Sequence, residues 1–157
     1  MKFRKPIKED IETLKNISTN FKKQYNWAKE IPIANIDTDK KAKERLFSDD
    51  IENILIAAEN NKMVGYLAVK KFVVDEKIGY EASIIIDSKF RGNGLAKKMT
   101  NMVFNNISKD KVVEAWVHQN NVPSLQTVKS LGFKFVKHFK DDKMIRIFTK
   151  YGNKQGD

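Results

Sequence analysis

The residues best suited to chemistry lie in a short glycine-containing segment, Phe90–Met99, which follows the apolar run Ile84–Ile86. The first turn of a helix leaves backbone N–H groups without partners, and the helix dipole makes that end positive. Because Gly92 and Gly94 have no side chains, a bulky anion can approach the backbone closely. The segment therefore predicts either a phosphate-binding loop between a strand and a helix or a plain turn.

Two common nucleotide-binding motifs do not fit this segment. A dinucleotide-binding fingerprint needs a glycine or alanine three residues after Gly94, where the sequence has Lys97. A P-loop needs Gly-Lys-Ser/Thr, and the segment does not contain it. If the loop binds phosphate, the ligand therefore belongs to another class.

The composition limits the class of protein. A chain of 157 residues that is 41% hydrophobic suits one domain with a real core. No apolar run approaches the roughly 20 residues that cross a bilayer, and Met1–Pro6 does not begin a signal peptide. We therefore expect a cytoplasmic protein with no membrane partner. Without cysteine, and with two histidines, the sequence offers no disulfide, no cysteine nucleophile and no convincing metal site.

The formal net charge of +10 comes mainly from lysine, since only four of the 30 basic residues are arginine. Proteins that read nucleic-acid sequence favour arginine for its forked donors. The excess charge thus favours general attraction of anions, such as a polyphosphate cofactor, or simply a solvated lysine-rich surface. We expect no nucleic-acid partner.

The spacing of apolar residues predicts the elements that position the segment. Strands are expected at residues 2–7, 54–58, 63–72, 78–86, 111–117, 133–139 and 143–150. Helices are expected after an N-cap at Asp10, over residues 40–47 and 122–131, and with one apolar face made of Leu95, Met99, Met102, Val103 and Ile107. This order predicts a mixed α/β domain over residues 1–150, followed by a polar, frayed tail at 151–157.

Two motifs at the expected separation resemble those of the GCN5-related N-acetyltransferase (GNAT) superfamily. The acyl-CoA signature of that family, Arg/Gln-x-x-Gly-x-Gly/Ala, is matched by Arg91-Gly92-Asn93-Gly94-Leu95-Ala96. The family's Asn-x-x-Ala/Ser helix, which ends in Leu-Gly-Phe, is matched by Asn121-Val-Pro-Ser124 and Leu131-Gly132-Phe133. The resemblance covers nearly the whole chain. It implies a mostly antiparallel sheet of about seven strands flanked by four helices, with two central parallel strands, 78–86 and 111–117, that splay apart.

The resemblance implies acetyl-CoA as the donor substrate and specific residues to bind it. Backbone N–H groups of Arg91, Gly92, Asn93, Gly94, Leu95 and Ala96 would hold the pyrophosphate. Backbone groups of Ile84, Ile85 and Ile86 would pair with the pantetheine arm, and the N–H of Ile86 would contact the acetyl carbonyl. Asn121 and Ser124 would lie near the pantetheine. Lys97 and Lys98 would attract the 3′-phosphate or form a solvated face.

The proton-transfer groups are less well defined. Glu81 is expected to act as general base through water, or else to pair with a lysine across the sheet. Glu114 and His118 are further candidates, although a histidine at that strand end can also lie at the surface. The tyrosine that often serves as general acid in the family is replaced by Val128, which cannot donate a proton. Candidates for the acid are Tyr80, Ser124 and Tyr151.

The expected activity is direct transfer of acetyl from acetyl-CoA to a primary amine, with a small molecule as the favoured acceptor. Tyr25 and Trp27 would line the acceptor pocket or cap the core. The alternatives are acetylation of a protein N-terminus or lysine, and a regulatory module that binds acyl-CoA with little turnover, which Val128 supports. The sequence leaves open both the acceptor and the choice between monomer and homodimer.

Overall fold

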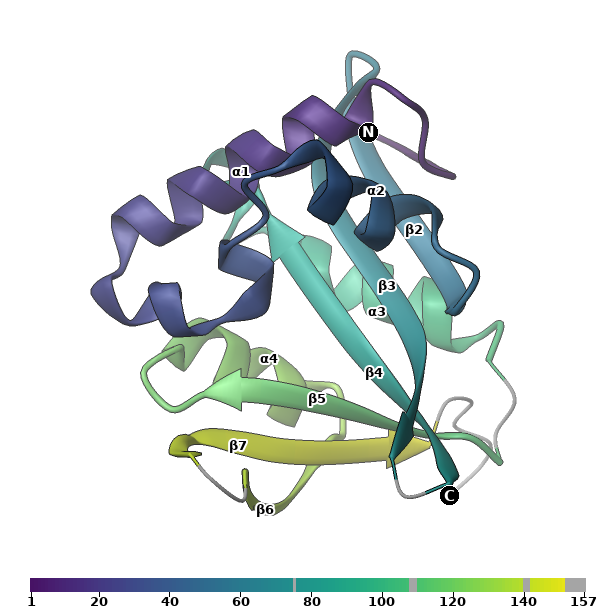
Figure 1. The fold of residues 1–157 in the computed structure, drawn as a ribbon, viewed down its shortest axis with the longest axis vertical. Coiled ribbons are helices and arrows are strands. Elements are labelled where there is room, and N and C mark those ends of the chain that lie inside the picture. The colour runs from purple at the N-terminus through teal and green to yellow at the C-terminus, as the bar shows by residue number, and fades with distance from the viewer. Residues whose placement is uncertain (75, 108–109, 140–141, 152–157) are drawn as a thin grey trace.

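A single twisted sheet organises the chain. The computed structural model describes residues 1–74, 76–107, 110–139 and 142–151. Its seven strands have the order β1-β2-β3-β4-β5-β7-β6 (Figure 1). They are β1 (Lys2–Arg4), β2 (Ile51–Glu59), β3 (Lys62–Val74), β4 (Lys77–Ile86), β5 (Val112–His118), β6 (Lys134–Phe139) and β7 (Asp142–Tyr151). Only β4 and β5 pair in parallel, and all the other neighbouring strands are antiparallel.

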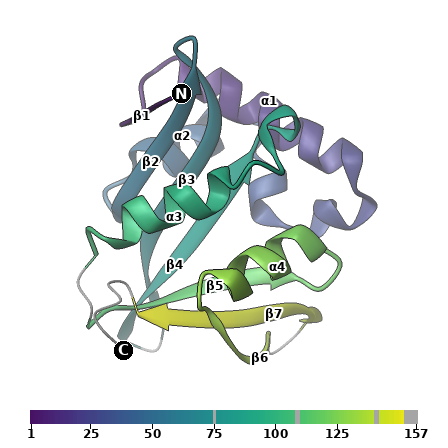
Figure 2. The ribbon, with the colours of Figure 1, turned by 180° about the vertical axis from the view of Figure 1, so that it is seen from behind.

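Helices cover both faces of the sheet. Helices α1 and α2 lie on one face and α3 and α4 on the other (Figures 1 and 2). The α-helices are α1 (Asp10–Gln24), α2 (Asp39–Phe47), α3 (Leu95–Phe104) and α4 (Val122–Ser130), and the short 3₁₀ helices are η1 (Asn26–Glu30), η2 (Pro32–Ala34) and η3 (Ser88–Phe90). This arrangement confirms the predicted mixed α/β fold.

The central strand β3 shows why the sequence folds in this way. Residues 63–69 are all buried, because successive side chains point to opposite faces and each face is covered by helices. Tyr66 and Ala68 enter the core beneath α1 and α2, whereas Leu67 and Val69 enter the core beneath α3 and α4. The two apolar cores therefore hold the helices on either side of β4.

Strands β4 and β5 separate soon after they meet. Their parallel pairing is confined to Tyr80 with Val113 and Glu81 with Glu114. On its other edge β4 stays paired with β3 as far as Ile86. Figure 1 shows the two strands diverging toward their carboxyl ends. We refer to the backbone gap between residues 82–86 of β4 and 115–118 of β5 as the cleft. The predicted splay of these strands is confirmed.

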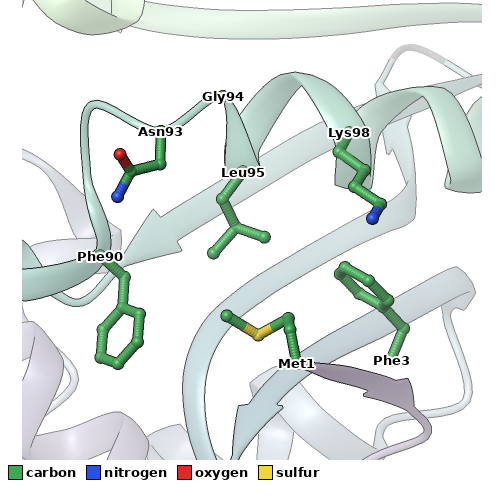
Figure 3. A pocket seen from close by; sticks show the side chains of 7 residues that line it. All are labelled: Met1, Phe3, Phe90, Asn93, Gly94, Leu95 and Lys98. Atoms are coloured by element: carbon green, nitrogen blue, oxygen red, sulfur yellow. The ribbon is translucent and has the colours of Figure 1, made fainter.

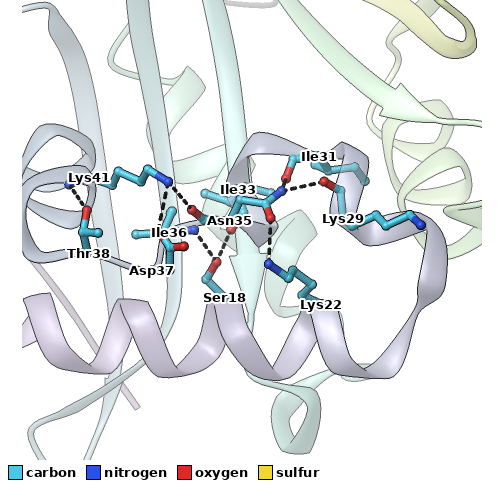
Figure 4. A network of polar contacts seen from close by, with 10 residues as sticks. All are labelled: Ser18, Lys22, Lys29, Ile31, Ile33, Asn35, Ile36, Asp37, Thr38 and Lys41. Atoms are coloured by element: carbon cyan, nitrogen blue, oxygen red, sulfur yellow. Dashed lines mark hydrogen bonds and ion pairs between the residues drawn. The ribbon is translucent and has the colours of Figure 1, made fainter.

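The segment between α1 and α2 is fixed by a polar network beside this cleft (Figure 4). The Ser18 hydroxyl donates to the carbonyl of Ile33 at 2.7 Å and accepts from the N–H of Ile36 at 2.9 Å. The Asn35 amide donates to the carbonyls of Lys29 and Ile31 at 2.9 and 2.8 Å. These bonds satisfy backbone carbonyl and N–H groups in a segment that has no long helix, so the segment can pack in one defined conformation beside the sheet.

Several local predictions were wrong. The N-cap of α1 is Glu9, because the Asp10 carboxylate instead accepts from Arg4 at 2.8 and 3.0 Å and from the Ile7 N–H at 2.8 Å. Met102 is 36% exposed and lies off the buried face of α3. Helix α2 starts at Asp39, since the Thr38 hydroxyl accepts from the Lys41 N–H. Of the predicted tail, residues 152–157 lie outside the described residues.

Candidate active site

The free edge of β4 borders the cleft. The Asp87 N–H donates to the Val64 carbonyl on β3 at 2.8 Å, whereas the Ile86 carbonyl accepts from Arg91 Nε at 2.9 Å. Because backbone groups alternate along a strand, Ile84 and Ile86 point their N–H groups toward the cleft. The same alternation turns the backbone of Ile85 toward β3. The geometry therefore brings two of the three predicted isoleucines to the cleft edge.

The glycine loop, residues 91–94, connects η3 to the start of α3. Gly92 and Gly94 have φ angles of +83° and +75°, which side chains other than glycine rarely adopt. Gly94 is the N-cap of α3 and provides no side-chain bond, and the first helical bond joins the Lys98 N–H to the Gly94 carbonyl at 3.0 Å. The N–H groups of Leu95, Ala96 and Lys97 therefore have no intrahelical acceptor.

The space around the loop also fits an anion. A Cβ built on Gly92 or Gly94 would have no heavy atom within 4 Å, and both residues are exposed. Asn93 and Lys97 are exposed as well. Positive N–H groups, open space and nearby lysine are the elements of a phosphate site at a helix N-terminus. The residues present therefore fit the pyrophosphate of a CoA donor.

The side chain of Arg91 does not point into this open space. Its Nη1 donates to Gln24 Oε1 at 3.3 Å, and its Cζ lies 5.1 Å from the centroid of the Phe21 ring. With the Nε bond to Ile86, the guanidinium joins the glycine loop to the end of α1. Only the backbone of Arg91 is therefore available to a phosphate.

A cavity of about 200 Å³ lies between the glycine loop and β1 (Figure 3). Its lining consists of Met1, Phe3, Phe90, Asn93, Gly94, Leu95 and Lys98. Lys98 Nζ lies 5.1 Å from the centroid of the Phe3 ring. The Lys98 side chain is thus turned toward β1.

Glu81 lies where β4 and β5 part, on the face covered by α1 and α2. Burial raises the pKa of its carboxyl group, and the nearby charge of Glu114 raises it further, while Arg45 and Lys70 oppose the shift. Lys70 is its Cα partner across the β3–β4 ladder, but the Lys70 ammonium lies 3.4 Å from Asp50 Oδ2. A carboxylate with a raised pKa is better matched to proton transfer near neutral pH.

The two residues predicted for catalysis lie far apart on β4. Glu81 and Ile86 are five residues apart on the same strand, which corresponds to roughly 16 Å. A base must reach the reacting proton directly or through water, so an N–H nearer to Glu81 suits the carbonyl contact better. Ile84 also faces the cleft and lies roughly 10 Å along the strand from Glu81. The geometry therefore favours Ile84 for the carbonyl contact.

His118 ends β5 and is 1% exposed, so the interpretation that it lies at the surface is wrong. Its Nδ1 accepts from the Asn120 N–H at 3.1 Å, which assigns the proton to Nε2. Nε2 lies 3.1 Å from Glu30 Oε2, and the ring stacks on Trp27 with centroids 5.1 Å apart. Glu30 could not be identified from the sequence, because nothing in its local pattern marks a partner 88 residues away.

At the other side of the cleft, Asn121 begins α4. Its Oδ1 accepts from the Ser124 N–H at 3.3 Å and caps the helix, so its Nδ2 is the group left to donate to a ligand. Val128 is 9% exposed and packs in the core beneath α4. The structure therefore places no proton donor at that position.

The other candidate acids have different surroundings. Tyr80 is half-buried, with Lys111 Nζ 4.9 Å from its ring centroid. The side chain of Tyr151 lies outside the described part of the structure. Glu114, a candidate base, accepts from Trp116 Nε1 at 2.8 Å and is thereby turned along β5.

The described residues contain no group of three histidine, aspartate or glutamate side chains that could hold a metal ion. None of the helices described has the length and apolar character needed to cross a membrane.

Comparison with known proteins gives a family and a fold. The profile of the acetyltransferase (GNAT) family matches residues 17–133. The structure is similar to an N-acetyltransferase, PaiA, from Thermoplasma acidophilum in complex with coenzyme A, with 18% identity, 96% of this chain and 98% of that chain covered, and a TM-score of 0.72.

Other solved structures have the same arrangement. NAA60 of Arabidopsis thaliana in complex with acetyl-CoA has 15% identity, coverage of 96% and 97%, and a TM-score of 0.71. A GNAT-family acetyltransferase of Streptococcus agalactiae has 14% identity, coverage of 98% and 96%, and a TM-score of 0.73. At these identities the structural similarity shows the fold alone. No protein of curated function matches the sequence significantly.

Proposed function

The chain belongs to the acetyltransferase (GNAT) family of acetyl-CoA-dependent transferases, and we propose that it acetylates the primary amine of a small molecule. One observation carries the proposal. The unpaired edge of β4 leads directly to a glycine loop whose helical N–H groups face open space. An extended thiol arm can pair with such an edge while its pyrophosphate occupies the helix start.

The donor site follows from these groups. Backbone N–H groups of the glycine loop and of Leu95 and Ala96 would hold the pyrophosphate, with Lys97 adding positive charge nearby. The cleft-facing backbone of Ile84 and Ile86 would hold the pantetheine from the β4 side. Asn121 Nδ2 would donate from the α4 side. The donor substrate would thereby be held between the two diverging strands.

The chemistry rests on Glu81 and Ile84. The N–H of Ile84 would donate to the acetyl carbonyl and stabilise the negative charge that develops as the amine attacks. An amine must lose its proton before or during attack, and Glu81 would accept it through water. The buried position of Glu81 favours its neutral form, so the carboxylate regains its proton readily.

The departing thiolate needs less assistance. Val128 offers no proton, so Tyr80, Ser124 and solvent are the remaining candidate donors among the described residues. CoA thiolate is a modest base and can leave with a proton from water. No covalent enzyme intermediate is required, which agrees with a chain that has no cysteine.

The acceptor would enter from the face covered by α1 and α2. The half-buried rings of Tyr25 and Trp27 lie at that side of the cleft mouth, and the hydrogen-bonded segment from η1 to Asn35 closes it further. A closed wall of this kind favours a small amine over an extended polypeptide. Acetylation of a protein N-terminus or lysine is the alternative.

A thiol-release assay tests the proposal. Acetyl-CoA is mixed with the protein and a panel of amines and peptides, and free CoA thiol is followed with a disulfide reagent. Because the chain has no cysteine, its own background is negligible. We expect thiol release with at least one small primary amine. Release with peptides alone would contradict the small-molecule acceptor.

The buried valine supports one second function. If Val128 removes an acid that turnover requires, the protein binds acetyl-CoA as a regulatory module. Saturable acetyl-CoA binding without thiol release for any acceptor would favour this function over catalysis. Absence of binding would contradict both.

A further inference from the structure

A continuous row of side chains in ring contact crosses the open end of the cleft between β4 and β5. We propose that this row, formed by Arg91, Phe21, Tyr25, Trp27 and His118, is a strap that sets the separation of the two strand ends. The strap thereby determines how tightly acetyl-CoA binds. This inference rests on the proposed function, because its purpose is to position the donor site.

The geometry of the strap is continuous from one strand to the other. Arg91 Cζ lies 5.1 Å from the centroid of the Phe21 ring, and Phe21 lies 5.4 Å from Tyr25 and 5.9 Å from Trp27. Tyr25 and Trp27 stack with centroids 5.1 Å apart, and Trp27 stacks on His118 at 5.1 Å with an interplanar angle of 19°. These separations are those of favourable cation–π and aromatic pairs.

Each end of the strap is anchored by hydrogen bonds. At the β4 end, Arg91 donates to the Ile86 carbonyl at 2.9 Å and to Gln24 at 3.3 Å. At the β5 end, His118 lies 3.1 Å from Glu30 and accepts from the Asn120 N–H at 3.1 Å. Both anchors therefore bind the same segment of chain, from the end of α1 through η1, to opposite sides of the cleft.

The strands need such a connection because their own ladder ends early. Pairing stops at Glu81 and Glu114, so in the described part of the structure none of the last five residues of β4 has a pairing partner on β5. Donor-binding groups lie on both sides of this gap, with Ile84 on β4 and Asn121 after β5. A small change in the gap would move one set of groups out of reach.

These contacts make Arg91 and His118 positioning residues. The guanidinium is directed at α1 and away from the open side of the glycine loop, so its charge is not placed for a phosphate. The imidazole is buried, with partners on both nitrogens, so it is not placed for a reacting proton. Both side chains act on the donor site through the segment that they hold.

A double-mutant cycle on acetyl-CoA affinity tests the strap. The two substitutions are Arg91→Lys, which keeps the charge but loses the planar fork, and Trp27→Leu, which removes the central stack. The two side chains belong to different ends of the strap and have no direct contact in the pairs described. We expect each substitution to weaken binding about tenfold, and the double variant about tenfold as well, because either change breaks the same device.

Independent effects would instead multiply to about a hundredfold loss, and that result would overturn the strap. Wild-type affinity in Arg91→Lys would also overturn it, because charge alone would then suffice. Trp27→Phe keeps an aromatic ring in the stack, so it should bind acetyl-CoA within about twofold of wild type. This variant therefore separates loss of the ring contact from loss of affinity caused by misfolding. Far-ultraviolet circular dichroism checks that each variant is folded.

Two matched controls complete the experiment. Lys89→Gln removes an exposed positive charge two residues before Arg91, and His138→Gln removes the other histidine, which is exposed on β6. Both should retain wild-type affinity, and a tenfold loss in either would overturn the specific role of the strap. Failure of the wild-type protein to bind acetyl-CoA would contradict the proposed function itself, whereas wild-type binding with an additive cycle would contradict the strap alone.

Discussion

Replacement of Gly94 by aspartate tests the pyrophosphate site, and replacement of Gly94 by asparagine is the matched control. Gly94 is the N-cap of α3 at φ +75°, and a Cβ at this position meets no heavy atom within 4 Å. A side chain there therefore causes no clash with the protein. Backbone strain of about 1–2 kcal/mol remains, and Asn and Asp share it because both tolerate this conformation better than other residues.

The difference between Gly94→Asp and Gly94→Asn then isolates one negative charge. A carboxylate at residue 94 would lie about 5 Å from a phosphate bound at the helix start. With an effective dielectric constant of about 20, one charge pair at that distance costs about 3 kcal/mol, or roughly a 150-fold loss of affinity. The doubly charged pyrophosphate makes this a lower bound at low salt.

Isothermal titration calorimetry with CoA measures the difference directly. We expect Gly94→Asp to bind at least about 100-fold more weakly than Gly94→Asn at low salt, with a smaller ratio at high salt. S-Acetylpantetheine, which lacks the phosphates, should bind both variants equally. Equal CoA affinities in the two variants would refute the placement of the pyrophosphate.

Three further predictions follow from single side chains. Glu81→Gln should lower the transfer rate about 10²- to 10⁴-fold without weakening acetyl-CoA binding. The variant should also lose the rise in rate that wild type shows as pH passes the raised pKa of Glu81. Unchanged rates would exclude Glu81 as the base. Because the folded state raises this pKa, the wild-type protein loses stability as pH rises from the ordinary glutamate range through the raised value. Denaturation with urea should therefore show Glu81→Gln to be more stable than wild type at pH 8 and equally stable at pH 4, and the reverse order would contradict the burial argument. Arg4→Met leaves the carboxylate of Asp10, which is 2% exposed, without its ion-pair partner and should lower the free energy of unfolding by about 3 kcal/mol; a loss below about 0.5 kcal/mol would mean that the pair behaves as a surface pair.

The fold was predictable because the local sequence patterns specify the same helices and strands that pack together in space. Strand β3 reads as a strongly apolar run, and the turn at Asn60 and Asn61 has the positive φ angles that asparagine tolerates, at 52° and 66°. Gly132 ends α4 as predicted, with its N–H bonded to Lys129 and that of Phe133 bonded to Val128. Errors of a few residues arose where a side chain had a distant partner, as Asp10 has in Arg4.

The candidate site was predictable where the backbone provides its chemistry. The glycine loop and strand β4 are local features, so the sequence pattern located them, and the resemblance to the GNAT superfamily implied what they would bind. The direction of the Arg91 side chain and the burial of His118 depend on α1 and η1, which are far away in sequence. The wide separation of Glu81 and Ile86 became visible only when both were placed on one straight strand.

The central claim is that acetyl-CoA lies between β4 and β5 with its pyrophosphate at the start of α3. Two-dimensional ¹H–¹⁵N spectra recorded during titration with acetyl-CoA test it most directly, because each backbone N–H reports separately. We expect the largest shifts at Ile84, Ile86 and the N–H groups from Gly94 to Lys97, with little change at Ile85. Saturable shifts confined to other parts of the chain, or shifts at Ile85 without Ile84 and Ile86, would contradict it.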